Sequence, residues 1–153
     1  MRHLMRFLAL ALTIGLLGAS AAMAQDKGDK KTTDIQVWAI RATTKNKDIS
    51  PELKRIAEEL KKQFKFTGFK LEKSATDSKE IGKAYTTLLI GGYTANVTPQ
   101  KTAGKRITLE VEVLKGKERK LKTTVTLTAG KFQLLGGLDL DGGDALIVAV
   151  SGQ

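Results

Sequence analysis

The chain has 153 residues, of which 26 are lysine or arginine and 16 are aspartate or glutamate, so its formal net charge is +10 at pH 7. It contains one histidine and no cysteine. These counts suit a single domain, and they exclude disulfides, cysteine nucleophiles and zinc sites built on cysteine.

Residues 1–24 have the three parts of an export signal. Two arginines precede a mostly apolar run at 7–18, which is shorter than the roughly twenty residues that a membrane-spanning helix needs. The small residues Ala22 and Ala24 then form a cleavage site. We predict cleavage between Ala24 and Gln25, and therefore a periplasmic or secreted protein.

Cleavage would also change the chemistry of the mature chain. It would remove His3, the only histidine in the sequence, together with two of the 26 basic residues. The mature chain would then have neither imidazole nor thiol, which excludes histidine-based triads and cysteine–histidine pairs. It would remain basic, which either favours an anionic partner or serves solubility.

The next segments predict a tether and then a buried strand. Residues 25–33 contain no apolar side chain, so we predict a polar flexible tether there. A single globular domain is expected over 34–151. Its first strand, 34–43, carries apolar residues at odd and even positions, which is typical of a strand covered on both faces.

One helix is predicted, over 50–65. Ser50 and Pro51 suit the N-cap and the first helical position. The apolar residues that follow fall on one stripe, at a spacing of three to four. They are Leu53, Ile56, Ala57, Leu60 and Phe64.

After residue 65 the apolar period becomes two, which predicts strands. We place them at 66–73, 79–90, 93–98, 105–114, 119–128, 131–135 and 145–150. Glycine pairs at 91–92, 136–137 and 142–143 predict turns, and Pro99 predicts the end of a strand.

The clearest hairpin joins the strands at 105–114 and 119–128. Apolar residues stand at odd numbers in both, so the numbers of two facing residues must have an even sum. A two-residue loop would give an odd sum and turn one strand inside out. We therefore predict a three-residue loop at 116–118. It pairs two apolar residues and two oppositely charged ones, namely Val113 with Leu121 and Glu112 with Lys122.

The number of strands limits the fold. Seven or eight strands about 4.8 Å apart make a flat sheet that is too wide for one helix, about 10 Å across, to cover. The sheet must therefore cover part of itself. We predict an α+β domain, with a mostly antiparallel curled sheet or sandwich of about seven to eight strands and one amphipathic helix after the first strand.

A basic cluster at the tip of the hairpin is the first candidate site. Its members are Lys115, Lys117, Arg119, Lys120 and Lys122. No aromatic residue is interleaved with them, which argues against nucleic acid. The cluster predicts contact with an acidic face of an envelope protein or with an anionic envelope polymer, and it would also allow peripheral contact with a membrane surface.

An acidic cluster near the C-terminus is a candidate calcium loop. It consists of Asp139, Asp141 and Asp144. The spacing departs from the EF-hand pattern, which requires a glycine at the sixth position and a glutamate at the twelfth. Aspartate and glycine are also common in tight turns. We favour the turn and predict neither a metal nor a cofactor.

These observations predict a non-enzymatic, exported binding or accessory protein of the bacterial cell envelope. Its contact surface would be an exposed strand edge or the basic hairpin tip. The alternative is a periplasmic carrier that holds a small apolar or anionic ligand between the helix and the curled sheet. Such a cavity would be lined by Trp38, Leu60, Phe64 and Phe69.

Overall fold

The structure is a computed structural model, and it describes residues 31–153. Within this range it contains eight strands, a 3₁₀ segment (Pro51–Ile56) that continues into helix α1 (Ala57–Gln63), and a short 3₁₀ turn (Asp141–Gly143). In chain order the strands are β1 (Thr32–Thr43), β2 (Gly68–Glu80), β3 (Tyr85–Leu88), β4 (Tyr93–Ala103), β5 (Arg106–Lys115), β6 (Glu118–Thr128), β7 (Gln133–Asp139) and β8 (Ala145–Gly152).

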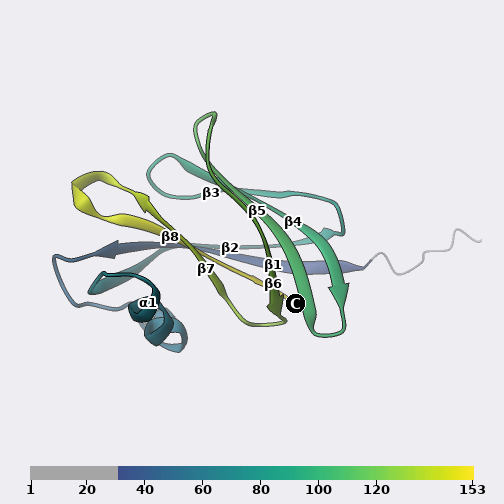
Figure 1. The fold of residues 1–153 in the computed structure, drawn as a ribbon, viewed down its shortest axis with the longest axis horizontal. Helices are drawn as coiled ribbons and strands as arrows, with labels where there is room; N and C mark the ends of the chain where they lie inside the picture. Colours follow the sequence, from purple (N-terminus) through teal and green to yellow (C-terminus); the bar gives the residue numbers. More distant parts are fainter. Residues whose placement is uncertain (1–30) are drawn as a thin grey trace, which may run out of the picture.

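The strands form two antiparallel sheets of four. The first sheet has the order β2-β1-β8-β7 and the second has the order β3-β4-β5-β6 (Figure 1). The two sheets face each other and are not closed into a barrel. This confirms the predicted α+β class, the antiparallel sandwich and the helix after the first strand.

The main core lies between the two sheets. The odd-numbered residues of β1 and the even-numbered residues of β8 face the apolar side of β4 and β5. Its most deeply buried members include Ile35, Val37, Leu109, Val111 and Val148. At about 25 cal/mol per Å² of apolar surface, each such side chain stabilises the fold by roughly 1.5–3 kcal/mol.

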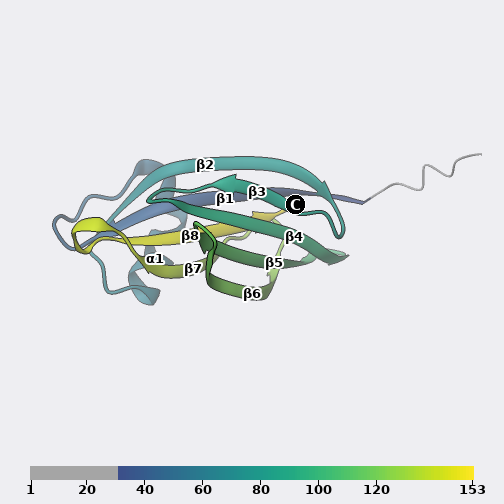
Figure 2. The same cartoon turned by 90° about the horizontal axis from the view of Figure 1, so that it is seen from above.

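A second core lies on the other face of the first sheet, under the helix. Leu53 and Leu60 pack there against Ile40, Phe69 and Ile147. The helix covers one half of this sheet, away from the C-terminal end of the chain (Figure 1). The molecule therefore has three layers over part of its length, namely the second sheet, the first sheet and the helix. Figure 2 looks onto the sheets from above, with the helix fainter behind them. As predicted, β1 is buried on both faces.

The helix differs from the prediction in its first half. Residues Pro51–Ile56 form a 3₁₀ segment before the α-helix begins. Ser50 stands at the N-cap position, but its side chain makes no capping bond. Its Oγ instead accepts a hydrogen bond from the Leu71 N–H of β2, at 3.0 Å. The serine thus ties the start of the helix to the sheet.

The strands after the helix also have different bounds. The predicted break at residues 74–78 lies inside β2, which runs for 13 residues to Glu80. Polar residues suit this strand because it is at the edge of its sheet, where one side faces water. The turn falls instead around Gly82, whose φ is +85°, and leaves β3 with four residues.

The predicted register of the β5–β6 hairpin is confirmed, but the predicted loop is wrong. Val113 faces Leu121 and Glu112 faces Lys122. The loop nevertheless has two residues, since Lys115 faces Glu118. A bulge at Lys120 adds the residue that restores the even sum.

Two further signals for turns or strand ends mark bulges instead. Gly136-Gly137 lies inside β7, where the pairing with β8 shifts by one residue. A Cβ on Gly136 would lie 2.8 Å from the Leu146 carbonyl oxygen, so close approach requires glycine there. Pro99 lies inside β4, and the bulge at Gln100 follows it.

The ends of the domain are slightly longer than predicted. Thr32 and Thr33, assigned above to the tether, belong to β1 and face Glu80 and Lys79. The export signal and tether residues 25–30 lie outside the described residues. Within residues 31–153, no helix is both long and apolar enough to cross a bilayer.

Candidate functional site

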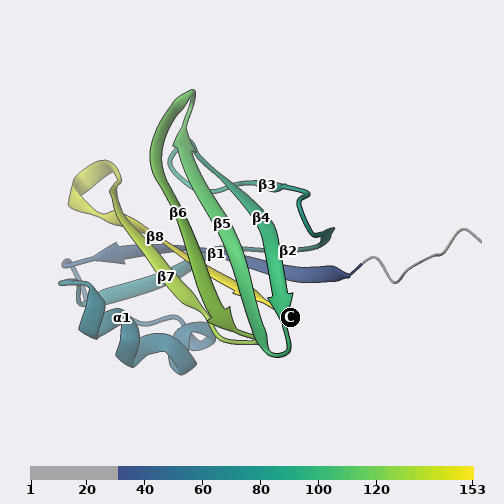
Figure 3. The same cartoon turned by 45° about the vertical axis from the view of Figure 1, so that its right-hand side comes forward.

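The basic cluster lies at the tip of the β5–β6 hairpin, as predicted. Figure 3 shows this tip projecting beyond the rest of the second sheet. Three of the five cations are paired with glutamates of the same hairpin. The pairs are Arg119–Glu112 at 3.6 Å, Lys120–Glu118 at 3.0 Å and Lys122–Glu110 at 3.8 Å. The Lys115 Nζ lies 5.2 Å from the centre of the Tyr93 ring.

These pairs leave the tip basic. Five cations stand against three glutamates, and the pairing with Glu118 raises the pKa of Lys120. Exposed ion pairs contribute little, about 0–1 kcal/mol each, because water and salt compete with them. The glutamates are therefore held only weakly by these pairs.

The edge of β6 continues from this tip. β6 pairs with β5 alone among the described strands, so its other side is a sheet edge. The register and the bond from the Ala129 N–H to the Lys105 carbonyl place the odd-numbered amides of 121–129 toward β5. The amides of Lys122, Thr124 and Thr126 therefore point away from the sheet.

The core beneath β6 is incompletely covered. Leu121, Thr123 and Val125 face inward but remain half-buried, whereas their partners Val111 and Val113 on β5 are fully buried. Beyond its bulge, β6 carries no charge from 123 to 128. This is a smooth edge of β-branched residues and leucine, beside an apolar margin.

The other three edges are each interrupted by a bulge, short or charged. The segment before the helix covers the start of β2, where the Phe69 N–H donates to the Asp48 carbonyl at 2.8 Å, and a bulge follows at Glu72. Strand β3 has four residues. Strand β7 carries the Gly136-Gly137 bulge. Bulges, charges and short strands are the usual protection of sheet edges, so β6, with six uncharged residues at 123–128 and no bulge among them, offers the longest uninterrupted uncharged edge among the described strands.

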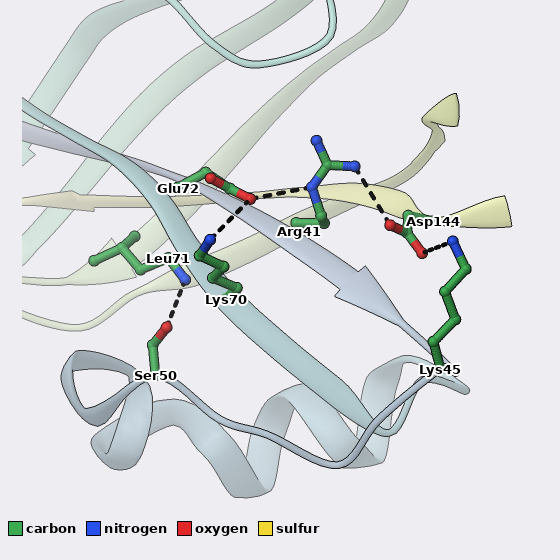
Figure 4. A network of polar contacts seen from close by, with 7 residues as sticks. All are labelled: Arg41, Lys45, Ser50, Lys70, Leu71, Glu72 and Asp144. Carbon is green, nitrogen blue, oxygen red and sulfur yellow. Dashed lines mark hydrogen bonds and ion pairs between the residues drawn. The ribbon is translucent and has the colours of Figure 1, made fainter. Parts of the chain in front are cut away.

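A polar cavity of about 400 Å³ lies at the far end of the first sheet. Its walls come from the end of β1, the loop before the helix, the start of β2 and the residue before β8. Figure 4 shows the ion pairs there. Asp144 accepts from the Arg41 Nη1 at 3.4 Å and pairs with the Lys45 Nζ at 3.5 Å, while the Arg41 Nε donates to Glu72 at 3.1 Å.

The position of Asp144 changes its acidity. Its side chain is 12% exposed, and the neighbouring Thr43 side chain is the main cause that lowers its pKa. Desolvation opposes this effect, and the charges of Lys45 and Arg41 add to it. The carboxylate is thus held ionised by neighbours at the end of β1 and in the loop that follows it.

The lowered pKa of Asp144 predicts a loss of stability in acid. A carboxyl group with a lowered folded-state pKa stabilises the fold above its unfolded value, about 3.9, and this contribution is lost as the pH falls through the folded value. Asp144→Asn should be less stable than the wild type at neutral pH, and the difference should shrink below about pH 4. Urea unfolding at several pH values measures it.

Asp141→Asn is the matched control, because Asp141 is exposed in the same turn and makes no ion pair within residues 31–153. Its stability should follow the wild type at every pH. A constant difference between Asp144→Asn and the wild type down to pH 2 would contradict the assignment.

The candidate calcium residues do not converge. Among residues 31–153, no group of three or more acidic or histidine side chains is placed to hold a metal ion. Asp144 faces Arg41 and Lys45 instead, and Asp141 begins the short 3₁₀ turn. The segment from Asp139 to Asp144 forms the connection between β7 and β8.

The candidate ligand-lining residues lie in the core under the helix. Leu60 is 0% exposed, Phe69 1% and Trp38 6%, while Phe64 is half-buried at the margin. The Phe132 ring covers Trp38, with the two ring centres 4.2 Å apart. The Arg55 guanidinium also lies over the Trp38 ring. Side chains of the chain itself thus occupy the space between helix and sheet, which counts against a ligand there.

Sequence reasoning missed the polar cavity. Its residues come from positions near 41–50, 69–70 and 144, which no spacing rule connects. The one available signal was Arg41, a charged residue that interrupts the apolar sequence of β1.

No protein-family model matches this sequence, and no curated protein matches it. Two solved secretins show weak structural likeness. The T2SS secretin XcpQ from Pseudomonas aeruginosa aligns at a TM-score of 0.36 and 13% identity, over 80% of this chain and 55% of the secretin. The Salmonella SPI-1 type III secretion injectisome secretin InvG aligns at 0.31 and 12%, over 80% and 58%.

This chain therefore spans little more than half the length of either secretin structure. At these TM-scores the likeness establishes neither a family nor a function.

Proposed function

We propose that this chain is a non-enzymatic, exported binding module of the bacterial cell envelope, which takes an extended acidic segment of another envelope protein onto the edge of β6. In this mode the partner adds a strand to the second sheet. Main-chain hydrogen bonds supply affinity, and side chains on alternate positions supply specificity.

The observation that carries the proposal is the incomplete burial along β6. Leu121 and Val125 belong to the same layer as fully buried residues of β5, yet they are half-buried. An added strand would cover them and would pair with the outward amides of Thr124 and Thr126. Each main-chain bond contributes about 0.5–1.5 kcal/mol, and the newly covered apolar surface adds to it.

The preference for an acidic segment follows from charge. The β6 edge begins at the basic tip, where five cations stand against three glutamates. Attraction between opposite charges increases the rate of association and fixes the register of the partner. An uncharged partner would lack this selection.

The location is part of the same proposal. The basic, apolar and small-residue parts of residues 1–24 support export. The absence of imidazole and thiol from the mature chain supports a non-enzymatic role, because most familiar nucleophile–base pairs require one of them.

A proline in the β6 edge tests the proposal directly. Thr126→Pro removes one outward amide, and edge strands tolerate proline where the N–H faces solvent. We expect its stability to change by about 1 kcal/mol or less, while partner binding weakens at least tenfold. The measurement is capture in the intact envelope by a photoreactive residue at position 124, with the captured protein identified by mass spectrometry.

Thr126→Val is the matched control, because it keeps the amide and the β-branched shape. It should capture the same protein as the wild type. Equal capture by Thr126→Pro would reject pairing along β6, and capture that survives high salt unchanged would reject the acidic partner.

A further inference from the structure

The polar cavity has the features of a ligand site that is separate from the β6 edge. Its volume, about 400 Å³, lies within the range of small-molecule sites, roughly 300–1,000 Å³. Such sites combine apolar walls with a few convergent polar groups. Here Phe69 and Ile49 supply the apolar wall, and Arg41, Lys45 and Lys70 supply cations.

The cations are only loosely engaged within the chain. Lys45 and Lys70 reach their carboxylate partners at 3.5 and 3.9 Å, whereas a direct charge-assisted bond spans about 2.7–2.9 Å. Their side chains are 62% and 71% exposed. Both ammonium groups can therefore turn toward a ligand with little loss of existing bonding.

Arg41 has donors to spare and a fixed position. Its Nε donates to Glu72 and its Nη1 to Asp144, while its Nη2 has no partner among the described residues. The two carboxylates hold the guanidinium plane in place, as Figure 4 shows. A guanidinium held in this way is well suited to bind a carboxylate.

The balance of charge sets the ligand's charge. Among the residues that line the cavity, Arg41, Lys45 and Lys70 exceed Asp48 and Asp144 by one positive charge. Glu72 pairs with Arg41 and Lys70 from outside the lining. One negative charge on a ligand balances this network. A dianion or trianion would meet the carboxylates of Asp144 and Asp48 in the same cavity.

We propose that this cavity binds a small monocarboxylate with an apolar chain. The carboxylate lies against Arg41, Lys45 and Lys70, and the chain lies against Ile49 and Phe69. This site borders the filled core under the helix, because Ile49 and Phe69 belong to both, and it does not depend on the strand-addition function.

Titration followed by two-dimensional NMR of the mature protein tests the site. The probe is isocaproate, and the matched neutral compound is isocaproamide, which has the same apolar chain. We expect isocaproate to shift the amide signals of residues 44–50 and 69–70 in a saturable manner. Isocaproamide should bind at least tenfold more weakly, because a hydrogen bond to a charged group contributes about 1.5–3 kcal/mol.

Lys70→Gln is the informative variant, since its exposed side chain is not needed for folding. It should weaken isocaproate several-fold, and Arg41→Gln should weaken it at least tenfold. Lys62→Gln, on the exposed side of the helix, is the control and should leave binding unchanged. Equal binding of isocaproamide, tighter binding of citrate, no saturable shift, or an unchanged affinity in both variants would overturn the proposal.

Discussion

Phe69→Ala should lower the free energy of unfolding by about 3–5 kcal/mol, the usual cost of removing a buried phenylalanine. The Phe69 side chain is 1% exposed and packs in the core between the helix and the first sheet. Its backbone also joins β2 to the segment before the helix, through bonds to Asp48 at 2.8 Å and from Ser50 at 2.9 Å. Loss of the ring would therefore loosen the helix layer as well as leave a cavity.

Phe66→Ala is the matched control. Phe66 lies three residues earlier and is half-buried at the margin of the same core. It should cost no more than half as much, because less apolar surface leaves water. Urea unfolding measures both variants, and equal losses would contradict the helix layer as described.

Gly136→Ala should lower the free energy of unfolding by about 3 kcal/mol. The φ of Gly136 is +118°, a conformation that costs an alanine roughly 1–3 kcal/mol. A Cβ there would also lie 2.8 Å from the Leu146 carbonyl oxygen. Since that atom belongs to the backbone of β8, relief of the contact would disturb the pairing of β7 with β8.

Gly143→Ala is the control that separates the cost of a positive φ from the cost of the Cβ contact at Gly136. Gly143 also has a positive φ, +79°, but a Cβ there would meet nothing within 4 Å. It should cost about 1 kcal/mol, the strain of a left-handed alanine alone. If thermal unfolding shows the two variants to be equally stable, the bulge in β7 is not the reason for the glycine pair.

The faces of the strands could be predicted from the sequence because side chains alternate with a strict period of two. That period required Val113 to face Leu121, and the structure has this pair. The period could not decide the geometry of the loop, since a three-residue loop and a two-residue loop with a bulge at Lys120 put the same residues on each face. The glycine pair at 136–137 has the same ambiguity, because the turns and the bulges that need positive φ both favour glycine.

Features that depend on distant residues were beyond the sequence. The basic tip could be predicted because its residues lie within one hairpin. The β6 edge required knowledge of which strands stand at the margins of the two sheets. The polar cavity required Arg41, Lys70 and Asp144 to meet, and these come from separate strands and loops.

The most direct test of the central claim is amide hydrogen exchange along β6 in the presence of a short peptide that alternates glutamate and valine. The strand-addition account predicts that this peptide slows the exchange of Thr124 and Thr126, whose amides point away from the sheet. The amides of Thr123 and Val125 already pair with β5 and should change little. The same peptide with lysine in place of glutamate should have no effect. Protection of the β2 amides instead, or equal protection by the lysine peptide, would contradict the account.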